Sequence, residues 1–485
     1  MRCASLAVPA LLVAAATLPS LLPNPVFAFS VIEVTSTSGE ANVEGECTLR
    51  DAITAANTDT AVGGCPAGAG DDEIHLPEGA VITLSEVDNT ERGASGLPAI
   101  SSAIFIAGGG ATIQRDPNLT CSPNEDADGD GNLLDDGEFR LFSVVGGGEL
   151  VLVDLTLANG CADGQFPSDR SGGAVYVSQG SLTIEDAILR NNRAGAVGGA
   201  LYRTGLPGTT TVRFSRLIDN ESVDNGGAIY SAGGGTTIES SLIDGNMAGG
   251  SGGGLFLSAG RLDIMNSTIS NNSTESNGGG VGTSNSFSDL LTTLTVVQST
   301  LSGNEAGAGD DGFPFPFPGP FSARATNGFG GAISTAGSLD VRYSSLVDNL
   351  ANDFEALFFG LNVLEADTRT ISGSLLAGAG TLCGGSTLDR LTAEGENIAT
   401  DDSCPGFTLI NADPLLGPLA NNGGPTPTHA LLPDSPAIDA AGECPGDLAT
   451  TDQRGLPRPG AGSTLCDLGA FEYQSPFIFS DRFER

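Results

Sequence analysis

One short pattern recurs between residues 148 and 349, and it limits the fold more strongly than any other feature of the chain. When the repeats are aligned on one asparagine, apolar residues stand three and eight positions before it, and a small residue stands five before it. A glycine pair follows six positions after most of these asparagines, and an apolar residue follows that pair. The asparagine column consists of Asn192, Asn220, Asn246, Asn272, Asn304 and Asn349.

The spacing of the repeats predicts a solenoid, because a unit of 26 to 28 residues buries its apolar face only by stacking on its neighbours. Within residues 260–264, apolar and polar side chains alternate, which indicates a strand rather than a helix. Short strands separated by Gly, Asn and Ser corners predict an all-β fold, a parallel β-helix with coils about 4.8 Å apart. We expect the asparagine column to be a structural ladder, because Asn tolerates left-handed corners and its amide can bond the next Asn.

The β-helix is expected over residues 73–378 and needs a cover at each end, because an open strand edge promotes aggregation. The N-terminal cap, residues 29–72, has apolar residues at helical spacing between residues 48 and 57, which predicts a short helical plug. Residues 379–474 contain four cysteines and are expected to form a disulfide-containing cap over the other end.

The two ends of the chain suggest export. A single arginine, an apolar run and a Val-Phe-Ala sequence predict a secretory signal peptide over residues 1–28. We therefore expect a secreted or bacterial cell-surface protein, which ends in a short tail at residues 475–485. Eight cysteines remain after the predicted cleavage, an even number that suits an oxidising compartment. Their order suggests local pairs, although it leaves the connectivity open: Cys47 with Cys65, Cys121 with Cys161, Cys383 with Cys404, and Cys444 with Cys466.

Three sets of residues resemble families of exported bacterial proteins. Residues 47–57 resemble the CSLREA motif of secreted β-helix proteins. The choice-of-anchor Q domain, which closes many such proteins, is similar to residues 411–414, 422–424, 433–439, 452–455 and 466–472. A weaker similarity links the polymorphic outer membrane proteins, which are adhesins, to the repeats at 172–175, 198–201, 226–229 and 330–333. Together these resemblances imply a secreted, surface-associated, right-handed β-helix and leave its activity open.

Two inserts are expected to interrupt the β-helix: an acidic segment at 121–138 and a Phe/Pro-rich loop at 308–328, whose prolines exclude a central strand. Alternating carboxylates before a glycine turn can converge on one hard cation, so the acidic segment is a candidate calcium site. The alternative is a solvated acidic loop, because a calcium loop needs a bidentate acid at its twelfth position, where this chain has Gly137, and Glu138 stands one residue later. The candidate ligands are Asp126, Asp128, Asp130, Asp135, Asp136 and Glu138.

The charge of the chain restricts its partners. All twenty basic residues are arginines, against 59 acids, which gives a formal net charge of −39. Such a charge argues against nucleic acid and anionic lipid as partners, and no apolar stretch after the signal peptide is long enough to cross a bilayer as a helix. The expected partner is an extracellular glycan or a cell-surface component, and the oligomeric state is left open.

Two functions suit such a chain. The first is a non-catalytic surface protein for adhesion, scaffolding or glycan binding. The second is a polysaccharide lyase or glycoside hydrolase that acts in a groove of the β-helix. Hydrolysis needs two carboxyls about 5 to 10 Å apart, and the available pairs are Asp219 with Asp244 and Asp348 with Asp353.

The sequence favours the non-catalytic function, because no convincing catalytic or cofactor-binding set is present apart from the candidate calcium ligands. Asp219 and Asp244 are expected at the surface, and His75 lies far from His429 in sequence. Four arginines could in principle serve a lyase, but they stand singly and are expected to be solvated: Arg190, Arg213, Arg216 and Arg261. An aromatic column fits either a sugar platform or an ordinary packed stack; its members are Tyr176, Tyr202, Tyr230 and Phe256.

Overall fold

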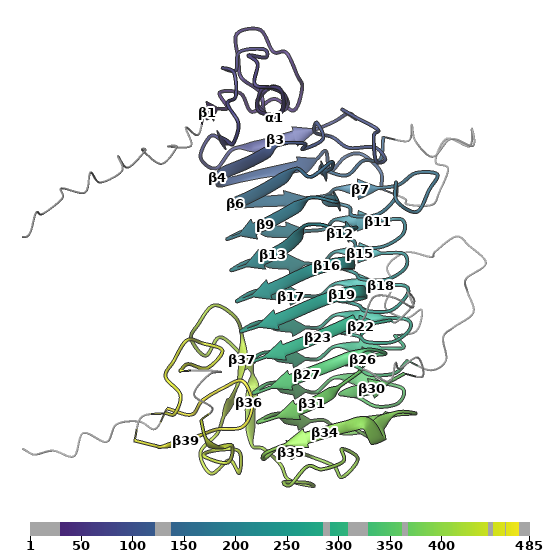
Figure 1. Ribbon diagram of the computed structural model, residues 1–485, viewed down its shortest axis with the longest axis vertical. Helices are drawn as coiled ribbons and strands as arrows, with labels where there is room; N and C mark the ends of the chain where they lie inside the picture. The colour runs from purple at the N-terminus through teal and green to yellow at the C-terminus, as the bar shows by residue number, and fades with distance from the viewer. Residues whose placement is uncertain are drawn as a thin grey trace, which may run out of the picture.

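The computed structural model describes residues 30–121, 137–284, 292–308, 328–360, 367–444, 450–460 and 462–474. The described chain winds into a β-helix whose coils stack along one long axis (Figure 1). Equivalent strands of successive coils pair in parallel, for example Leu201 with Ile229 and Leu217 with Ile243. The parallel β-helix predicted from the repeats is confirmed.

Each regular coil contributes strands to three faces. The first face contains β5 (Phe142–Val144), β8 (Val175–Ser178), β12 (Leu201–Thr204), the first parts of β16 (Ile229–Glu239) and β19 (Leu255–Met265), β22 (Val281–Thr283), β26 (Ile333–Thr335), β30 (Leu357–Phe359) and β33 (Cys383–Gly385). The second contains β1 (Ser30–Glu33), β2 (Asp72–His75), the first parts of β4 (Ala103–Arg115) and β6 (Glu149–Ala158), β9 (Ser181–Glu185), β13 (Thr209–Arg213), the later parts of β16 and β19, β23 (Thr292–Val297), β27 (Ser338–Arg342), β31 (Arg369–Ser372) and β34 (Leu391–Glu394).

The third face, which we call the docking face, carries the site described below. It contains β3 (Val81–Leu84), the later parts of β4 and β6, β10 (Ile188–Arg190), β14 (Arg216–Ile218), β17 (Leu242–Asp244), β20 (Thr268–Ser270), β24 (Thr300–Ser302), β28 (Ser345–Val347), β32 (Leu375–Ala377) and β35 (Ile398–Ala399). A short row of two-residue strands follows it: β7 (Cys161–Ala162), β11 (Arg193–Ala194), β15 (Glu221–Ser222), β18 (Met247–Ala248), β21 (Ser273–Thr274), β25 (Glu305–Ala306) and β29 (Leu350–Ala351).

A sharp corner joins the second face to the docking face in every regular coil. One residue there has a positive φ of 46° to 53°, a conformation that lets the chain turn within a single residue. After each corner from Asp186 onward, a small residue follows and donates its backbone N–H to the serine hydroxyl of the next coil, as in Ser215 to Ser241 at 3.1 Å. The corner column consists of Asp154, Asp186, Phe214, Ser240, Asn266, Gln298 and Tyr343.

The asparagine column forms a continuous buried ladder after the docking face. From Asn192 to Asn304, each side-chain amide donates to the Oδ1 atom of the next asparagine, at 2.8 to 3.0 Å, and that same Oδ1 accepts the backbone N–H of the preceding asparagine. The second amide hydrogen reaches a carbonyl of an earlier coil, such as Leu217 O from Asn246. The inward columns beside the ladder, including Leu217 and Ile243, are fully buried. The predicted structural role of these asparagines agrees with this geometry.

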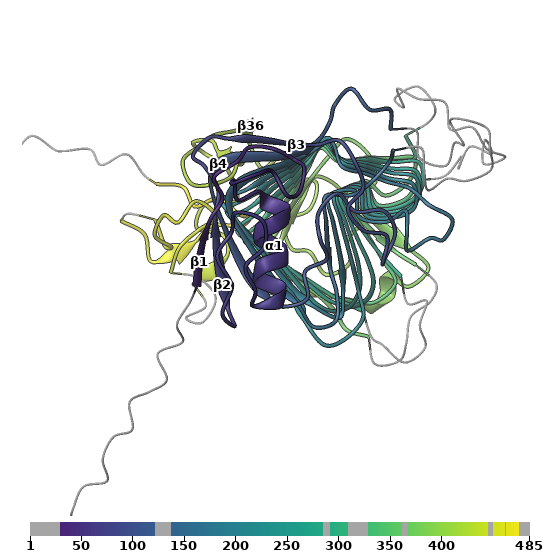
Figure 2. The ribbon, with the colours of Figure 1, turned by 90° about the horizontal axis from the view of Figure 1, so that it is seen from above.

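A helix covers the N-terminal end of the solenoid (Figure 2). Helix α1 (Leu49–Thr58) is capped by Thr48, whose hydroxyl accepts the backbone N–H of Asp51. Its apolar side, including Ile53, packs in the same core as the β-helix. The helical plug expected near residues 48–57 is therefore present. The solenoid itself starts earlier than expected at residue 73, because Ser30 of β1 already pairs with Asp72 of β2.

The C-terminal part of the chain differs from its expected position as a cap. Strands β33 and β34 and the turn η1 (Leu388–Arg390) form one more coil, and β35 extends the ladder beyond residue 378. The described residues of 409–474, here called the C-terminal segment, turn back and lie along the docking face (Figure 1). The segment contains two antiparallel pairs, β36 (Leu416–Ala420) with β37 (Thr428–Leu431) and β38 (Gly442–Glu443) with β39 (Leu465–Cys466).

Burial of apolar side chains explains why the C-terminal segment covers the later coils of the docking face. On the later coils the docking face presents Val347 and Leu375, which pack with Leu431, Leu468 and Phe471 of the segment in a second core. These strands lack large charged side chains, so covering them removes apolar surface from water without burying unpaired charges.

Four disulfides join the cysteines in the local pairs that their order suggested: Cys47–Cys65, Cys121–Cys161, Cys383–Cys404 and Cys444–Cys466. The signal peptide, the tail at 475–485 and most of the Phe/Pro-rich loop lie outside the described residues. Among the residues that the structure describes, no helix is both long and apolar enough to span a membrane.

Candidate binding pocket

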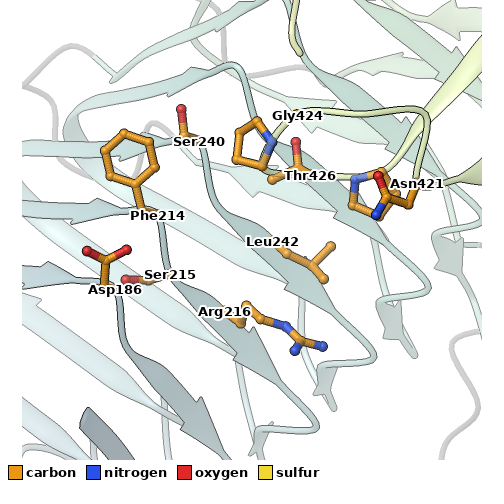
Figure 3. A pocket seen from close by; sticks show the side chains of 11 residues that line it. Asp186, Phe214, Ser215, Arg216, Ser240, Leu242, Asn421, Gly424 and Thr426 are labelled. Carbon is orange, nitrogen blue, oxygen red and sulfur yellow. The ribbon is translucent and has the colours of Figure 1, made fainter. Parts of the chain in front are cut away.

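An open pocket lies where the uncovered part of the docking face meets the edge of the C-terminal segment (Figure 3). Its volume is about 430 Å³. The β-helix supplies the corner residues of three successive coils and the strand residues beside them, and the segment supplies the opposite wall. The lining residues are Asp186, Phe214, Ser215, Arg216, Ser240, Leu242, Asn421, Gly424, Pro425, Thr426 and Pro427.

Phe214 is the least expected residue of the pocket. It occupies the corner column, where the neighbouring coils carry Asp186 and Ser240, and its φ is 50°. A bulky side chain in this left-handed region is strained, at a cost of order 1 kcal/mol or more. The ring is nevertheless 49% exposed, so little burial offsets the strain. An exposed aromatic residue with a strained backbone contributes little to stability and is therefore a candidate ligand contact.

Polar groups flank the ring on the β-helix side. Arg216 begins β14 and is exposed, and its side chain makes no hydrogen bond or ion pair within the described part of the chain. Asp186 holds the equivalent corner one coil earlier. In Figure 3 the guanidinium of Arg216 extends away from Asp186, so the two charges are not paired across the pocket. The floor thus offers a cation and an apolar ring from one coil and an acceptor from the preceding coil.

The opposite wall is fixed by a buried glutamine. Gln453 is 1% exposed, and its amide donates to Thr268 Oγ1 at 2.8 Å and to Thr426 Oγ1 at 2.9 Å. Its Oε1 atom accepts the hydroxyl of Thr300 at 2.7 Å. Thr268 also donates to the carbonyl of Pro427. The wall residues Thr426 and Pro427 are therefore held directly against β20 and β24.

A serine–histidine contact also lies between the docking face and the C-terminal segment. His429 Nε2 lies 2.9 Å from Ser302 Oγ, and its Nδ1 atom lies 2.8 Å from the carbonyl oxygen of Gly417. Burial lowers the pKa of His429, so its neutral form can donate to Gly417 and accept from Ser302. His429 borders a second open pocket of about 460 Å³ with Asp348 and Asp413, but Ser302 does not line that pocket. We assign this contact to docking of the segment.

The candidate calcium ligands are largely outside the described residues, namely Asp126, Asp128, Asp130, Asp135 and Asp136. Glu138 is described and buried, and its carboxylate opposes the lowering of the Arg115 pKa that burial causes. Within the described ranges, one group of three ligand-type side chains lies close together: Glu138 with Cys121 and Cys161. These cysteines form a disulfide and offer no thiolate. The calcium site stays a prediction.

The other residues considered from sequence lie outside the first pocket. Asp244 accepts hydrogen bonds from Ser270 and Asn271, and its pairing with Asp219 as a catalytic set gains no support. The aromatic column is present as a stack with ring centroids 5.2 to 5.6 Å apart, and Arg140 lies 4.7 Å from the ring centroid of Tyr176. That stack lies on the first face, so it does not form the pocket.

Sequence reasoning missed Phe214 and the residues of the opposite wall. The signal for Phe214 was available, because a phenylalanine interrupts a corner column that is otherwise mostly polar in the neighbouring coils. No sequence signal links residues 214–242 to residues 421–427, because the segment is not part of the repeat.

Comparisons with known proteins agree with the architecture. A family model described as "Right handed beta helix region" matches residues 146–313. The solved structure of the pectate lyase Pel9A is similar over 92% of this chain and 98% of its own, with a TM-score of 0.51 and 14% sequence identity. No curated protein matches the sequence. At this identity the likeness shows the fold alone: the chain is a right-handed parallel β-helix protein, and the chemistry of its pocket depends on its own residues.

Proposed function

We propose that this protein is an extracellular, non-catalytic carbohydrate-binding protein that holds a polysaccharide in the pocket around Phe214. The observation that carries the proposal is the half-exposed ring of Phe214, a residue with a strained backbone, between polar side chains. Aromatic rings offer a flat apolar surface on which the apolar face of a sugar ring can pack. Arg216, Asp186 and Asn421 supply donors and acceptors for hydroxyl groups around that surface.

The shape of the site suits a polymer rather than a small molecule. The pocket is open, and it lies on the long side of a rod whose neighbouring coils present further side chains in register. A small ligand usually binds in a closed, mostly apolar cavity that surrounds most of its surface. An open pocket on a flank leaves both ends of a bound chain free to continue, so it favours an internal stretch of a polysaccharide.

The alternative function is a polysaccharide lyase or glycoside hydrolase, and the fold similarity to a pectate lyase favours it. The residues of the pocket argue against hydrolysis, because hydrolysis by two carboxyl groups requires a pair about 5 to 10 Å apart. Asp186 is the one acid among the residues that line this pocket. The lining of the pocket therefore favours binding over hydrolysis by two carboxyl groups.

The test uses the full mature chain with a panel of neutral and acidic polysaccharides, followed by size-exclusion chromatography. Co-elution of the protein with one polymer of unchanged length is the expected result, and Phe214→Ala should abolish it. The matched control is Phe166→Ala, because Phe166 is 64% exposed and does not line the pocket. Shortened polymer would establish the enzymatic alternative. No co-elution with any polymer, or equal co-elution by the Phe214 variant, would overturn the proposal.

A further inference from the structure

Most arginines of the described chain are already engaged. Some are buried and donate to backbone carbonyls, as Arg203 does to Gly205, and others form ion pairs, as Arg193 does with Glu221 at 2.7 Å. The side chains of three arginines make no hydrogen bond or ion pair within the ranges that the structure describes: Arg92, Arg190 and Arg216. In a chain of net charge −39, a free cation is unusual because carboxylates are abundant.

Two of these three free cations lie side by side. Arg190 ends β10 and Arg216 begins β14, and the strands pair with Ile188 opposite Arg216 and Arg190 opposite Ile218. Leu189 precedes Arg190, Leu217 follows Arg216, and the two leucines lie opposite each other in the paired strands. Both leucines point into the core and are fully buried. Both arginines therefore project outward from the docking face, with backbones about 8 Å apart by the ordinary strand spacings.

We infer that the polysaccharide bound at this site is anionic, and that Arg216 and Arg190 each bind one of its acidic groups. This inference rests on the proposed function, and it adds the chemical class and the path of the ligand. The chain would pass over Phe214 and Arg216 in the pocket and continue across β10 towards the N-terminal coils. A guanidinium recognises a carboxylate or a sulfate through two parallel hydrogen bonds, which a neutral hydroxyl cannot match.

The acids near this path leave the two cations available. Glu185 is already paired with Arg213 at 2.5 Å, and one oxygen of Asp244 accepts hydrogen bonds from Ser270 and Asn271. Asp186 lies at the corner of the pocket and is free to accept a sugar hydroxyl. At physiological ionic strength, charges further than about 8 Å are largely screened, so the acidic remainder of the protein does not cancel a local contact.

The experiment compares alginate, a polyuronate, with its carboxyl-reduced neutral form and with dextran sulfate, using affinity electrophoresis of the full mature chain. The carboxyl-reduced polymer should bind at least about tenfold more weakly than alginate, because it lacks the charged acceptors. Arg216→Gln and Arg190→Gln should each weaken alginate binding about tenfold, and together about a hundredfold, since the sites are separate. Arg92→Gln is the matched control, and it should leave binding unchanged.

The outcomes separate this inference from the proposed function. Tighter binding of dextran sulfate through the same two arginines would support an anionic ligand and identify sulfate as its acidic group. Equal binding of alginate and its neutral form, unaffected by either arginine variant but lost in Phe214→Ala, would overturn the inference and leave the proposed function standing. No binding of any of the three polymers to the wild-type chain, in this assay and across the wider panel, would overturn both.

Discussion

Replacing Phe214 by alanine and by asparagine separates its role in binding from its effect on stability. Both substitutions remove the ring, but asparagine tolerates the left-handed corner better than alanine does. Full burial of a phenylalanine is worth about 1.5–3 kcal/mol, and Phe214 is 49% exposed, so loss of the ring should cost about 1 kcal/mol. Asparagine should recover about 1 kcal/mol through its tolerance of positive φ.

We therefore expect Phe214→Asn to match the wild-type free energy of unfolding and Phe214→Ala to lie about 1 kcal/mol below it. Both variants should lose polysaccharide binding completely. Urea unfolding followed by circular dichroism measures the first quantity, and co-elution with the polymer measures the second. Equal stability of the two variants would refute the argument from backbone strain. Retained binding in either variant would refute the role of the ring.

Three further predictions concern the ladder and the C-terminal segment. Asn246→Ala should lower the free energy of unfolding by roughly 3 kcal/mol in urea, because Asn220 loses its acceptor for two buried N–H groups, whereas the exposed Asn118→Ala should change little. Gln453→Ala should speed cleavage of the segment by thermolysin and weaken polymer binding, while the β-helix keeps its circular dichroism spectrum; unchanged cleavage would contradict the assigned role of this side chain. Burial raises the pKa of Glu472 to about 7, so the folded state holds a proton that the unfolded state has released, and the stability present below pH 4.5 should fall as the pH rises through 7. Glu472→Gln should remove this part of the pH dependence, and identical pH profiles of the two proteins would exclude it.

The sequence predicted the solenoid well because its core is strictly periodic. Each inward position is occupied by the same class of residue in every coil, as Leu217 and Ile243 illustrate, and a packed core tolerates few exceptions. The asparagine ladder was predictable for the same reason. The helical plug was visible because Leu49, Ile53 and Ala56 follow helical spacing next to the capping Thr48.

The position of the C-terminal segment could not be predicted, because the signal on the docking face is ambiguous. Thr268, Thr300 and Ser302 are small polar residues at outward positions, where sequence alone indicates contact with water. In the structure they are buried and donate to or contact Pro427, Gln453 and His429. This polar part of the interface leaves no apolar pattern in the sequence, and its partners lie more than a hundred residues away.

Function in such a solenoid is best sought where an outward position departs from its own column. Inward positions and ladder positions are constrained by packing and hydrogen bonding, so their residues report on stability. Corner and outward positions carry no such constraint, and the corners of the two coils that flank Phe214 carry the short polar residues Asp186 and Ser240. Phe214 departs from this rule at a cost in strain, and Arg190 and Arg216 depart from it by leaving two cations unpaired. Because both cations lack a partner in the described part of the chain and the half-exposed Phe214 has a strained backbone, their coincidence on adjacent coils is the strongest physical argument for a ligand on the docking face.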